Sequence, residues 1–493
     1  MYNPAMPSPR PHDAAPVPLP RADWLRRDML AVHALFAALL IAVLPFSGLP
    51  AAGVFSFGAC CLYGVYILLV MPQLICRYFL FWVQAVLNLL GVLACEYTVT
   101  ELTELQCMSG FAGSLPLLAF SWWCFFAVLW LIDGRTGGSS RPFAEPPETV
   151  CTLIDLLATA AALLAALVLF QTVSTAAPAV ALGVDRFEYA QNFSAAPSQL
   201  ITLLRCLMFV SVLAIRFGKR GVGVAGVALY VVYLYWIGTK FGGYLQVVAT
   251  FLLVYADKIS ADDVSRAAAA IKKNLLTALI VLAAIVAFAV WYQTSVSDLG
   301  IIEYLSRRLA QQGQLWWRTF EIWHDGALDR DLSVELAGLF DDGSTEEMVG
   351  ARHGIYGIMY LCAPQDVIDA KLARGSTYTA VGHAVVLSYF GSVGCVAYSL
   401  AAAALVAAVT RGLTHPVDDW QVFSIVLWGR LYFLVSSAFS MFDFAAFVSA
   451  FSLASYAVLI CVWLLRLDGA LRERGASPGH AAAALSGAGA HGV

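Results

Sequence analysis

The sequence predicts an all-α polytopic membrane protein. Hydrophobic residues make up 60% of the 493 residues and charged residues only 13%, whereas a soluble globular chain has roughly 45–50% and about 25%. Many apolar stretches approach or exceed the length of about 20 residues that an α-helix needs to cross a hydrocarbon core about 30 Å thick. One long polar stretch, residues 295–381, interrupts this pattern late in the chain. The composition excludes a soluble globular protein.

Each apolar stretch predicts one membrane-spanning helix, and we expect about 12 of them. The stretches are residues 29–46, 51–71, 75–95, 113–132, 150–175, 198–216, 221–238, 242–257, 274–294, 382–410, 419–444 and 446–466. The stretch at 242–257 is short for a crossing, and the one at 419–444 contains Arg430 and Asp443.

The helices divide the chain into five parts. Residues 29–294 are expected to form an N-terminal bundle of nine helices, residues 295–381 a large extracytoplasmic loop, and residues 382–466 three C-terminal helices. The two ends, residues 1–28 and 467–493, are rich in Pro, Ala and Gly. Because such segments bury too little apolar surface to fold, we expect disordered cytoplasmic tails.

The distribution of basic residues predicts the orientation. With the N-terminus in the cytoplasm, 18 of the 29 Lys and Arg residues lie on the cytoplasmic side, as the positive-inside rule requires. Both termini are then cytoplasmic, and the long loop faces the periplasm or cell exterior.

The loop begins with an amphipathic pattern over residues 300–323. Its apolar side chains share one arc at helical spacing, which predicts a helix lying flat on the membrane. Arg307 and Arg318 fall on the polar side, whereas Arg308 falls inside the apolar arc. Two interpretations remain open: Arg307 pairs with Glu303 while Arg308 snorkels to lipid phosphates, or these arginines hold the pyrophosphate of a lipid-linked substrate.

His383 is the candidate catalytic residue. It follows the loop directly, at the expected start of the tenth crossing, with Gly391 and Gly394 further along the same face. A near-neutral pKa suits histidine for removing a proton from a sugar hydroxyl. The alternative is an interfacial histidine that contacts lipid headgroups.

Further cations are expected at or within the membrane. Arg186 and Lys240 lie in short loops on the outer side, and with the loop arginines they supply the positive charge that a pyrophosphate leaving group requires. Arg205 and Arg430 are intramembrane charges, which are costly without a partner or a wet cavity. Asp443, Asp155 and Glu96 are the candidate partners.

No metal or other cofactor is expected. The acidic stretch after Asp329 departs from a calcium loop, because Val334 stands at the position of the tight-turn glycine. Of the eleven cysteines only Cys107 and Cys362 lie plainly on the outer side, and a disulfide between them is left open. The net charge of −4 gives no indication of a nucleic-acid partner.

Three motifs and the helix plan resemble Wzy-type O-antigen and oligosaccharide repeat-unit polymerases. The motifs are RRLAQQGQLWW at 307–317, GTKFGG at 238–243 and GHAVVLSYFGSVG at 382–394. The resemblance implies a lipid-dependent glycosyltransferase (GT-C type) helical fold, a bacterial inner membrane and an undecaprenyl-pyrophosphate-linked substrate. In the related O-antigen ligases an Asn typically follows the loop histidine, whereas Ala384 follows here.

The expected function is therefore polymerisation of lipid-linked repeat units on the outer face of the membrane. His383 is expected to act as general base for the acceptor hydroxyl. The expected ligands of the donor pyrophosphate are Arg307, Arg308, Arg318, Lys240 and Arg186, with Arg205 and Arg430 as intramembrane support. The expected partners are the lipid-linked oligosaccharide, the bilayer and a chain-length regulator protein. The alternatives are an O-antigen ligase, a flippase or exporter for lipid-linked oligosaccharides, and a purely structural assembly protein.

Overall fold

The structure is a computed structural model and is all-helical apart from one short pair of strands. It describes residues 29–134, 146–184, 186–193, 198–239, 242–259, 261–273, 301–326, 328, 330–338, 352–378, 382–418, 421–442, 444–449, 452–462 and 464.

Eight helices in the described residues are long and apolar enough to cross a membrane, and three shorter apolar helices accompany them. The shorter ones are Arg220–Trp236, Gly242–Val254 and Ser452–Val462. These helices coincide with the predicted stretches except 274–294, which lies outside the described residues. The prediction of a multi-pass, all-α membrane protein is confirmed.

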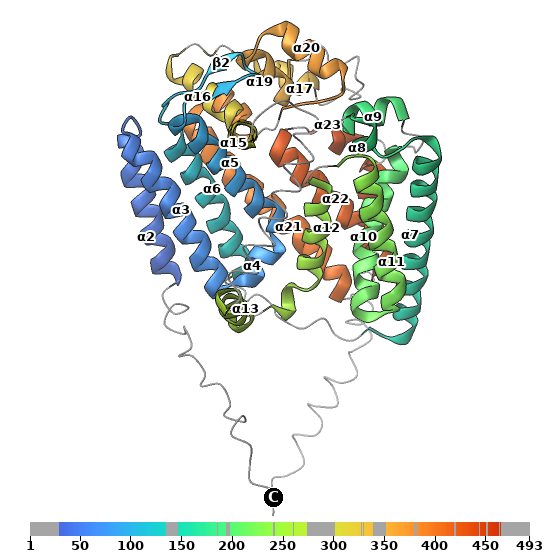
Figure 1. Ribbon diagram of the computed structural model, residues 1–493. Helices are drawn as coiled ribbons and strands as arrows, with labels where there is room; N and C mark the ends of the chain where they lie inside the picture. The colour runs from blue at the N-terminus through green and yellow to red at the C-terminus, as the bar shows by residue number, and fades with distance from the viewer. Residues whose placement is uncertain are drawn as a thin grey trace, which may run out of the picture.

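The membrane helices form two groups with three helices between them (Figure 1). The first group comprises α2 (Met29–Val43), α3 (Pro50–Val70), α5 (Phe79–Tyr97) and α6 (Leu115–Leu129). The second comprises α7 (Glu148–Thr175), α10 (Ser198–Phe217) and α11 (Arg220–Trp236), which pack on one another. Between the groups lie α12 (Gly242–Val254), α21 (Gly382–Asp418) and α22 (Val422–Met441). Because α21 packs on α6, and α22 packs on α10 and α21, the two groups form one body.

Short elements close one end of the bundle, which we call the cap end (Figure 1). They are β1 (Glu101–Leu102), β2 (Cys107–Met108), α15 (Ile301–Ala310), α16 (Gln314–His324), α17 (Leu332–Gly338), α19 (Gly354–Cys362) and α20 (Gln365–Ala373). Beside them lie α8 (Ala179–Leu182), α9 (Arg186–Phe193) and α23 (Ala445–Val448). A hydrogen bond from Gln191 Nε2 to the Ala373 carbonyl (3.3 Å) joins α9 to the end of α20.

The helix expected over 300–323 is two helices, and α16 packs on protein. The chain turns between α15 and α16 at Gly313, whose backbone lies directly against Gly91 of α5. Trp316 is fully buried and donates to the Ser114 carbonyl (3.3 Å), and Trp317 donates to the Gly110 carbonyl (2.7 Å). The expectation that the whole segment lies flat on the membrane is therefore wrong for α16, because α5, α19 and α21 cover its apolar face.

The α21 segment is a tight helical hairpin in place of the straight crossing expected at 382–410. Gly391 has φ 63° and ψ −158°, a conformation essentially restricted to glycine. His383 and Ser399 would lie about 24 Å apart in one straight helix, yet their side chains are 2.7 Å apart. The segment 382–390 therefore folds back along the segment after Gly391. A hydrogen bond from Cys395 Sγ to the His383 carbonyl (3.5 Å) supports the same antiparallel register.

The end opposite the cap is fixed by ion pairs. It carries α13 (Ala261–Lys273) and α4 (Pro72–Arg77). Asp133 is buried and accepts hydrogen bonds from Arg411 Nε (2.8 Å) and the Tyr78 hydroxyl, with Arg77 at 3.7 Å. A carboxylate with this many donors is satisfied in a dry site, so these contacts hold α4, α6 and α21 together.

Candidate functional site

The predicted cap arginines lie on α15 and α16 and are engaged by neighbouring groups. Arg307 pairs with Glu303 (2.7 Å) and Glu101 (3.1 Å). Arg308 donates to Gln311 Oε1 (3.0 Å), and Arg318 pairs with Glu321. The Arg307–Glu303 pair is the i, i+4 contact that the sequence predicted as one of two interpretations. Because these pairs are partly exposed to solvent, each contributes at most about 1 kcal/mol.

Arg186 and Lys240 complete the predicted set of outer cations. The structure places Arg186 at the start of α9, exposed at the cap end, with its guanidinium 4.4 Å from the centre of the Phe187 ring. Lys240 lies outside the described residues. Arg186 is thus near the cap but beside the second helix group. Arg307, Arg308 and Arg318 lie beside the first helix group.

His383 is inside the bundle and not at its mouth. Its side chain is 0% exposed, and Nε2 is bonded to the Ser399 hydroxyl. Four aromatic rings surround it at centroid distances of 5.3–6.4 Å, from Trp122, Trp316, Tyr398 and Phe439. No hydrogen bond, ion pair or ring contact in the described part of the chain links it to the predicted cap arginines.

This geometry gives His383 a positioning role. A general base needs to lie within about 2.6–3.2 Å of the proton that it removes, or one water away. Here Nε2 is occupied by Ser399, and Nδ1 is buried without a partner. The side chain pins the segment 382–390 to the longer arm of α21. The expectation of an accessible catalytic base at the helix mouth does not fit this arrangement, because the hairpin turns the residue inward.

The structure adds a cluster at the hairpin that sequence reasoning missed, formed by Arg330, Glu335, Ser388, Tyr389 and Gly354. Arg330 donates to Glu335 Oε1 (3.0 Å) and to the Ser388 hydroxyl (3.0 Å), and its guanidinium lies 4.4 Å from the centre of the Tyr389 ring. The Tyr389 hydroxyl also donates to Glu335 (2.7 Å), and the Gly354 N–H donates to both carboxylate oxygens (2.9 and 2.7 Å). We call this set the cap lock.

The cap lock joins α17, α19 and the hairpin. Arg330 and Glu335 are only 9% and 11% exposed, and burial lowers the pKa of Arg330, opposed by Tyr389 and Glu335. No sequence motif marks these residues, because Arg330 and Ser388 are 58 positions apart. The Glu335 carboxylate accepts hydrogen bonds from three residues. It therefore holds these elements together, which is a structural role and not a catalytic one.

The two intramembrane arginines lie where α10 packs on α22. Arg205 and the adjacent Cys206 are on α10, and Gly429, next to Arg430 on α22, lies against the Phe209 ring, one helical turn beyond Arg205. Arg205 faces the Tyr230 hydroxyl of α11, and Arg430 donates to the Ser452 hydroxyl (2.8 Å).

Two of the three predicted carboxylate partners of these arginines are engaged elsewhere. Asp155 accepts the Lys219 N–H (2.6 Å), at the end opposite the cap. Glu96 accepts the Ser114 N–H (2.5 Å), at the start of α6. The third, Asp443, lies outside the described residues.

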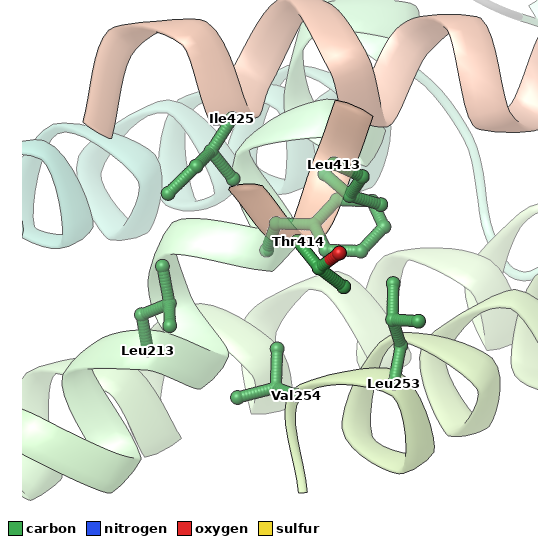
Figure 2. Close-up of a pocket in the computed structure, with 7 residues that line it drawn as sticks. Leu213, Leu253, Val254, Leu413, Thr414 and Ile425 are labelled. Atoms are coloured by element: carbon green, nitrogen blue, oxygen red, sulfur yellow. The ribbon is translucent and has the colours of Figure 1, made fainter. Parts of the chain in front are cut away.

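A small apolar pocket lies at the opposite end of the bundle, where α10, α12, α21 and α22 meet (Figure 2). Its lining includes Leu213, Leu253, Leu413 and Ile425. The one polar lining side chain, Thr414, donates to carbonyl oxygens of its own helix. The pocket therefore offers no group for catalysis and lies apart from His383 and from the cap.

Metal ligation and disulfide formation do not add to the site. Within the described residues no group of three or more His, Cys, Asp or Glu side chains is arranged to hold a metal ion. Cys107 and Cys362 are both free thiols. Burial raises the pKa of Cys362 to about 12, so this thiol stays protonated near neutral pH.

The comparisons with known proteins cover part of the chain. Residues 349–455 match the model of the family DUF6418, described as a family of unknown function. No curated protein and no solved structure matches the chain. The matched stretch, about a fifth of the sequence, contains α19, α20, the hairpin of α21 and α22. The chain is thus similar to DUF6418 in the region that carries His383 and Arg430.

Proposed function

We propose that the protein polymerises undecaprenyl-pyrophosphate-linked oligosaccharide repeat units by glycosyl transfer at the periplasmic face of a bacterial inner membrane. The cap faces the periplasm and both termini face the cytoplasm. An acceptor sugar hydroxyl forms the new glycosidic bond at the anomeric carbon of the donor glycan. The bond from that carbon to the pyrophosphate oxygen breaks, the lipid pyrophosphate leaves with the electron pair, and the hydroxyl proton passes to a base.

The observation that carries this proposal is the hairpin of α21 beneath the folded cap. A membrane protein without an extracytoplasmic task needs only short connections, whereas here α15, α16, α17 and α19 are fixed on the helix ends by the cap lock and by buried tryptophans. The turn at Gly391 lies against Trp323 of α16, so the hairpin and the cap form one continuous surface. Such a surface suits a lipid-linked sugar whose pyrophosphate lies near the headgroups.

The proposed roles of the predicted residues follow their positions. The five predicted cations, Arg186, Lys240, Arg307, Arg308 and Arg318, are proposed to attract the donor pyrophosphate. Arg307 and Arg318 also pair with carboxylates in the structure. His383 positions the hairpin. Removal of one well-placed cation is expected to lower the rate by about 10²–10³.

A lipopolysaccharide gel tests the proposal. The gene is deleted in the bacterium that encodes it and complemented with wild type, His383→Ala or Ser399→Ala at matched protein level. Collapse of the ladder to core plus one repeat, restored by wild type, supports a polymerase. Loss of every repeat-bearing band supports a ligase or a flippase instead, and an unchanged ladder contradicts all three.

The two variants, together with His383→Gln, distinguish a positioning role of His383 from a role as general base. Because Nε2 bonds to Ser399, a positioning role predicts that both variants reduce polymerisation and that His383→Gln, which retains a donor and an acceptor, restores part of it. A base role predicts that His383→Gln stays inactive while Ser399→Ala remains active.

A transporter of lipid-linked oligosaccharides is the second candidate. The turn at Gly391 and the arginine pair around Cys206 favour it, because discontinuous helices and intramembrane charges mark transport sites. The discriminating measurement uses proteoliposomes: a polymerase elongates repeat units supplied on the cap side alone, whereas a flippase moves a single lipid-linked unit across the bilayer without elongating it.

A further inference from the structure

We infer that Arg205, assisted by Arg430, forms an intramembrane site for the phosphate or pyrophosphate group of a polyprenyl lipid. This inference rests on the proposed function, because it names the part of the lipid-linked substrate that the second helix group binds. It concerns a place separate from the cap arginines.

The first step is the position of Arg205 in α10. Arg205 lies seven residues after Ser198, about 10 Å below the cap end of the helix at 1.5 Å per residue. The helix is enclosed at this point, since Leu204, Cys206 and Met208 are buried and α7, α11, α12 and α22 pack around it. A charged side chain here points into the bundle and not into open lipid, which is the usual placement of a functional intramembrane charge.

Arg216 of the same helix provides an internal comparison. It lies 11 residues further on, about three turns, and so on the same face. Arg216 makes a bidentate ion pair with Asp257 (2.6 and 2.7 Å), donates to the Val254 carbonyl, and lies 4.6 Å from the centre of the Phe217 ring. The carboxylate of Asp257 balances the charge of this arginine, although its Nε, like that of Arg205, has no hydrogen-bond acceptor.

Arg205 lacks such compensation. Its Nε is buried and has no hydrogen-bond acceptor, and no carboxylate in the described part of the chain pairs with it. Its neighbours are the neutral hydroxyl of Tyr230 and the thiol of Cys206. A charge within the membrane that has no counter-charge is costly, so the site favours an anion.

The second cation determines which anion fits. Arg430 approaches from α22, because its neighbour Gly429 packs on the Phe209 ring of α10, one helical turn beyond Arg205. Two guanidinium groups from different helices suit a group with two negative charges, and arginine binds phosphate oxygens with paired N–H donors. A free anion is strongly hydrated and is costly to bring into the membrane, whereas a phosphate carried on a lipid chain is already held at the bilayer, which favours a polyprenyl carrier over a free anion.

The test measures lipid binding to the full chain in nanodiscs by native mass spectrometry. The probes are undecaprenyl pyrophosphate, undecaprenol without a phosphate, and inorganic pyrophosphate. We expect undecaprenyl pyrophosphate to bind at least tenfold more tightly than either of the others. Arg205→Gln is expected to weaken this binding about 10- to 100-fold, as for loss of a charged hydrogen bond. Arg205→Lys, which keeps the charge, is expected to show an intermediate loss.

The control is Arg266→Gln, which removes an equal charge from an exposed arginine of α13 and is expected to bind as wild type does. Equal binding by wild type and Arg205→Gln, or equal binding of undecaprenol, overturns the inference, and tight binding of inorganic pyrophosphate alone points to a free-anion site instead. If Arg205→Gln does not fold, the comparison of the three probes on wild type and Arg205→Lys decides.

The outcome is separable from the proposed function. If binding depends on Arg205 but gene deletion leaves the lipopolysaccharide ladder unchanged, the lipid site stands and the polymerase proposal falls. If deletion collapses the ladder but binding is independent of Arg205, the polymerase proposal stands and this inference falls.

Discussion

Glu335→Ala removes the centre of the cap lock, and its effect is expected to be large and local. The Glu335 carboxylate accepts from Arg330, from the Tyr389 hydroxyl and from the Gly354 N–H. Loss of one partner of a buried ion pair costs roughly 3–5 kcal/mol. Because Arg330 keeps its bonds to Ser388 and to the Arg352 carbonyl, we expect the lower value, about 3 kcal/mol. At 1.4 kcal/mol per factor of ten, local opening increases about 100-fold.

Hydrogen exchange measured by mass spectrometry in nanodiscs reads this opening directly. Amides in Leu332–Gly338 and Gly354–Cys362 are expected to exchange about 100-fold faster in Glu335→Ala, while α10 and α11 keep their rates. The matched control is Glu321→Gln, whose pair with Arg318 is more than a third exposed and contributes at most about 1 kcal/mol. Unchanged exchange in both cap segments, or an equal effect of the two variants, would refute the assignment of the cap lock as the main link between cap and hairpin.

Three further predictions concern the hairpin, the cap and its thiols. Gly391→Ala should destabilise the protein by about 1–3 kcal/mol, because a side chain there adopts a disfavoured conformation; a drop in the melting temperature by fluorescence-detected size exclusion checks this. Gly91→Ala should destabilise the protein by about as much, because its methyl group would collide with the backbone at the α15–α16 turn. The control is Gly58→Ala, which has open space around it and should leave the melting temperature unchanged or raised. Equal effects of the two variants would contradict the docking of the cap at Gly91. A membrane-impermeant maleimide added to spheroplasts should label the half-buried Cys107 slowly and Cys362 only after denaturation, since burial raises the pKa of both thiols; labelling of Cys107 only after lysis would contradict a periplasmic cap.

The cap lock also explains why a long polar segment can be part of the membrane body. Arg330 and Glu335 belong to the polar stretch, and Tyr389 belongs to the hairpin. Their contacts fix this polar segment on the helix bundle. Any substrate bound beneath the cap would therefore meet a preformed surface.

The sequence alone determined the membrane class and the positions of most helices, because apolar length is a local property that needs no knowledge of neighbours. It also predicted the Arg307–Glu303 contact, because i, i+4 neighbours meet on any helix. It could not determine the direction of His383, because the turn at Gly391 depends on backbone angles and on packing against Trp316 and Phe439.

Only the tertiary structure decided which charges are satisfied. Arg205 and Arg216 lie on the same face of α10, yet Arg216 meets Asp257, 41 positions away, and Arg205 meets no carboxylate in the described part of the chain. The cap lock likewise joins residues up to 58 positions apart. Long-range pairing of this kind depends on how the helices pack against one another. Helix packing cannot be predicted from a local sequence pattern, because it depends on residues far apart in the chain.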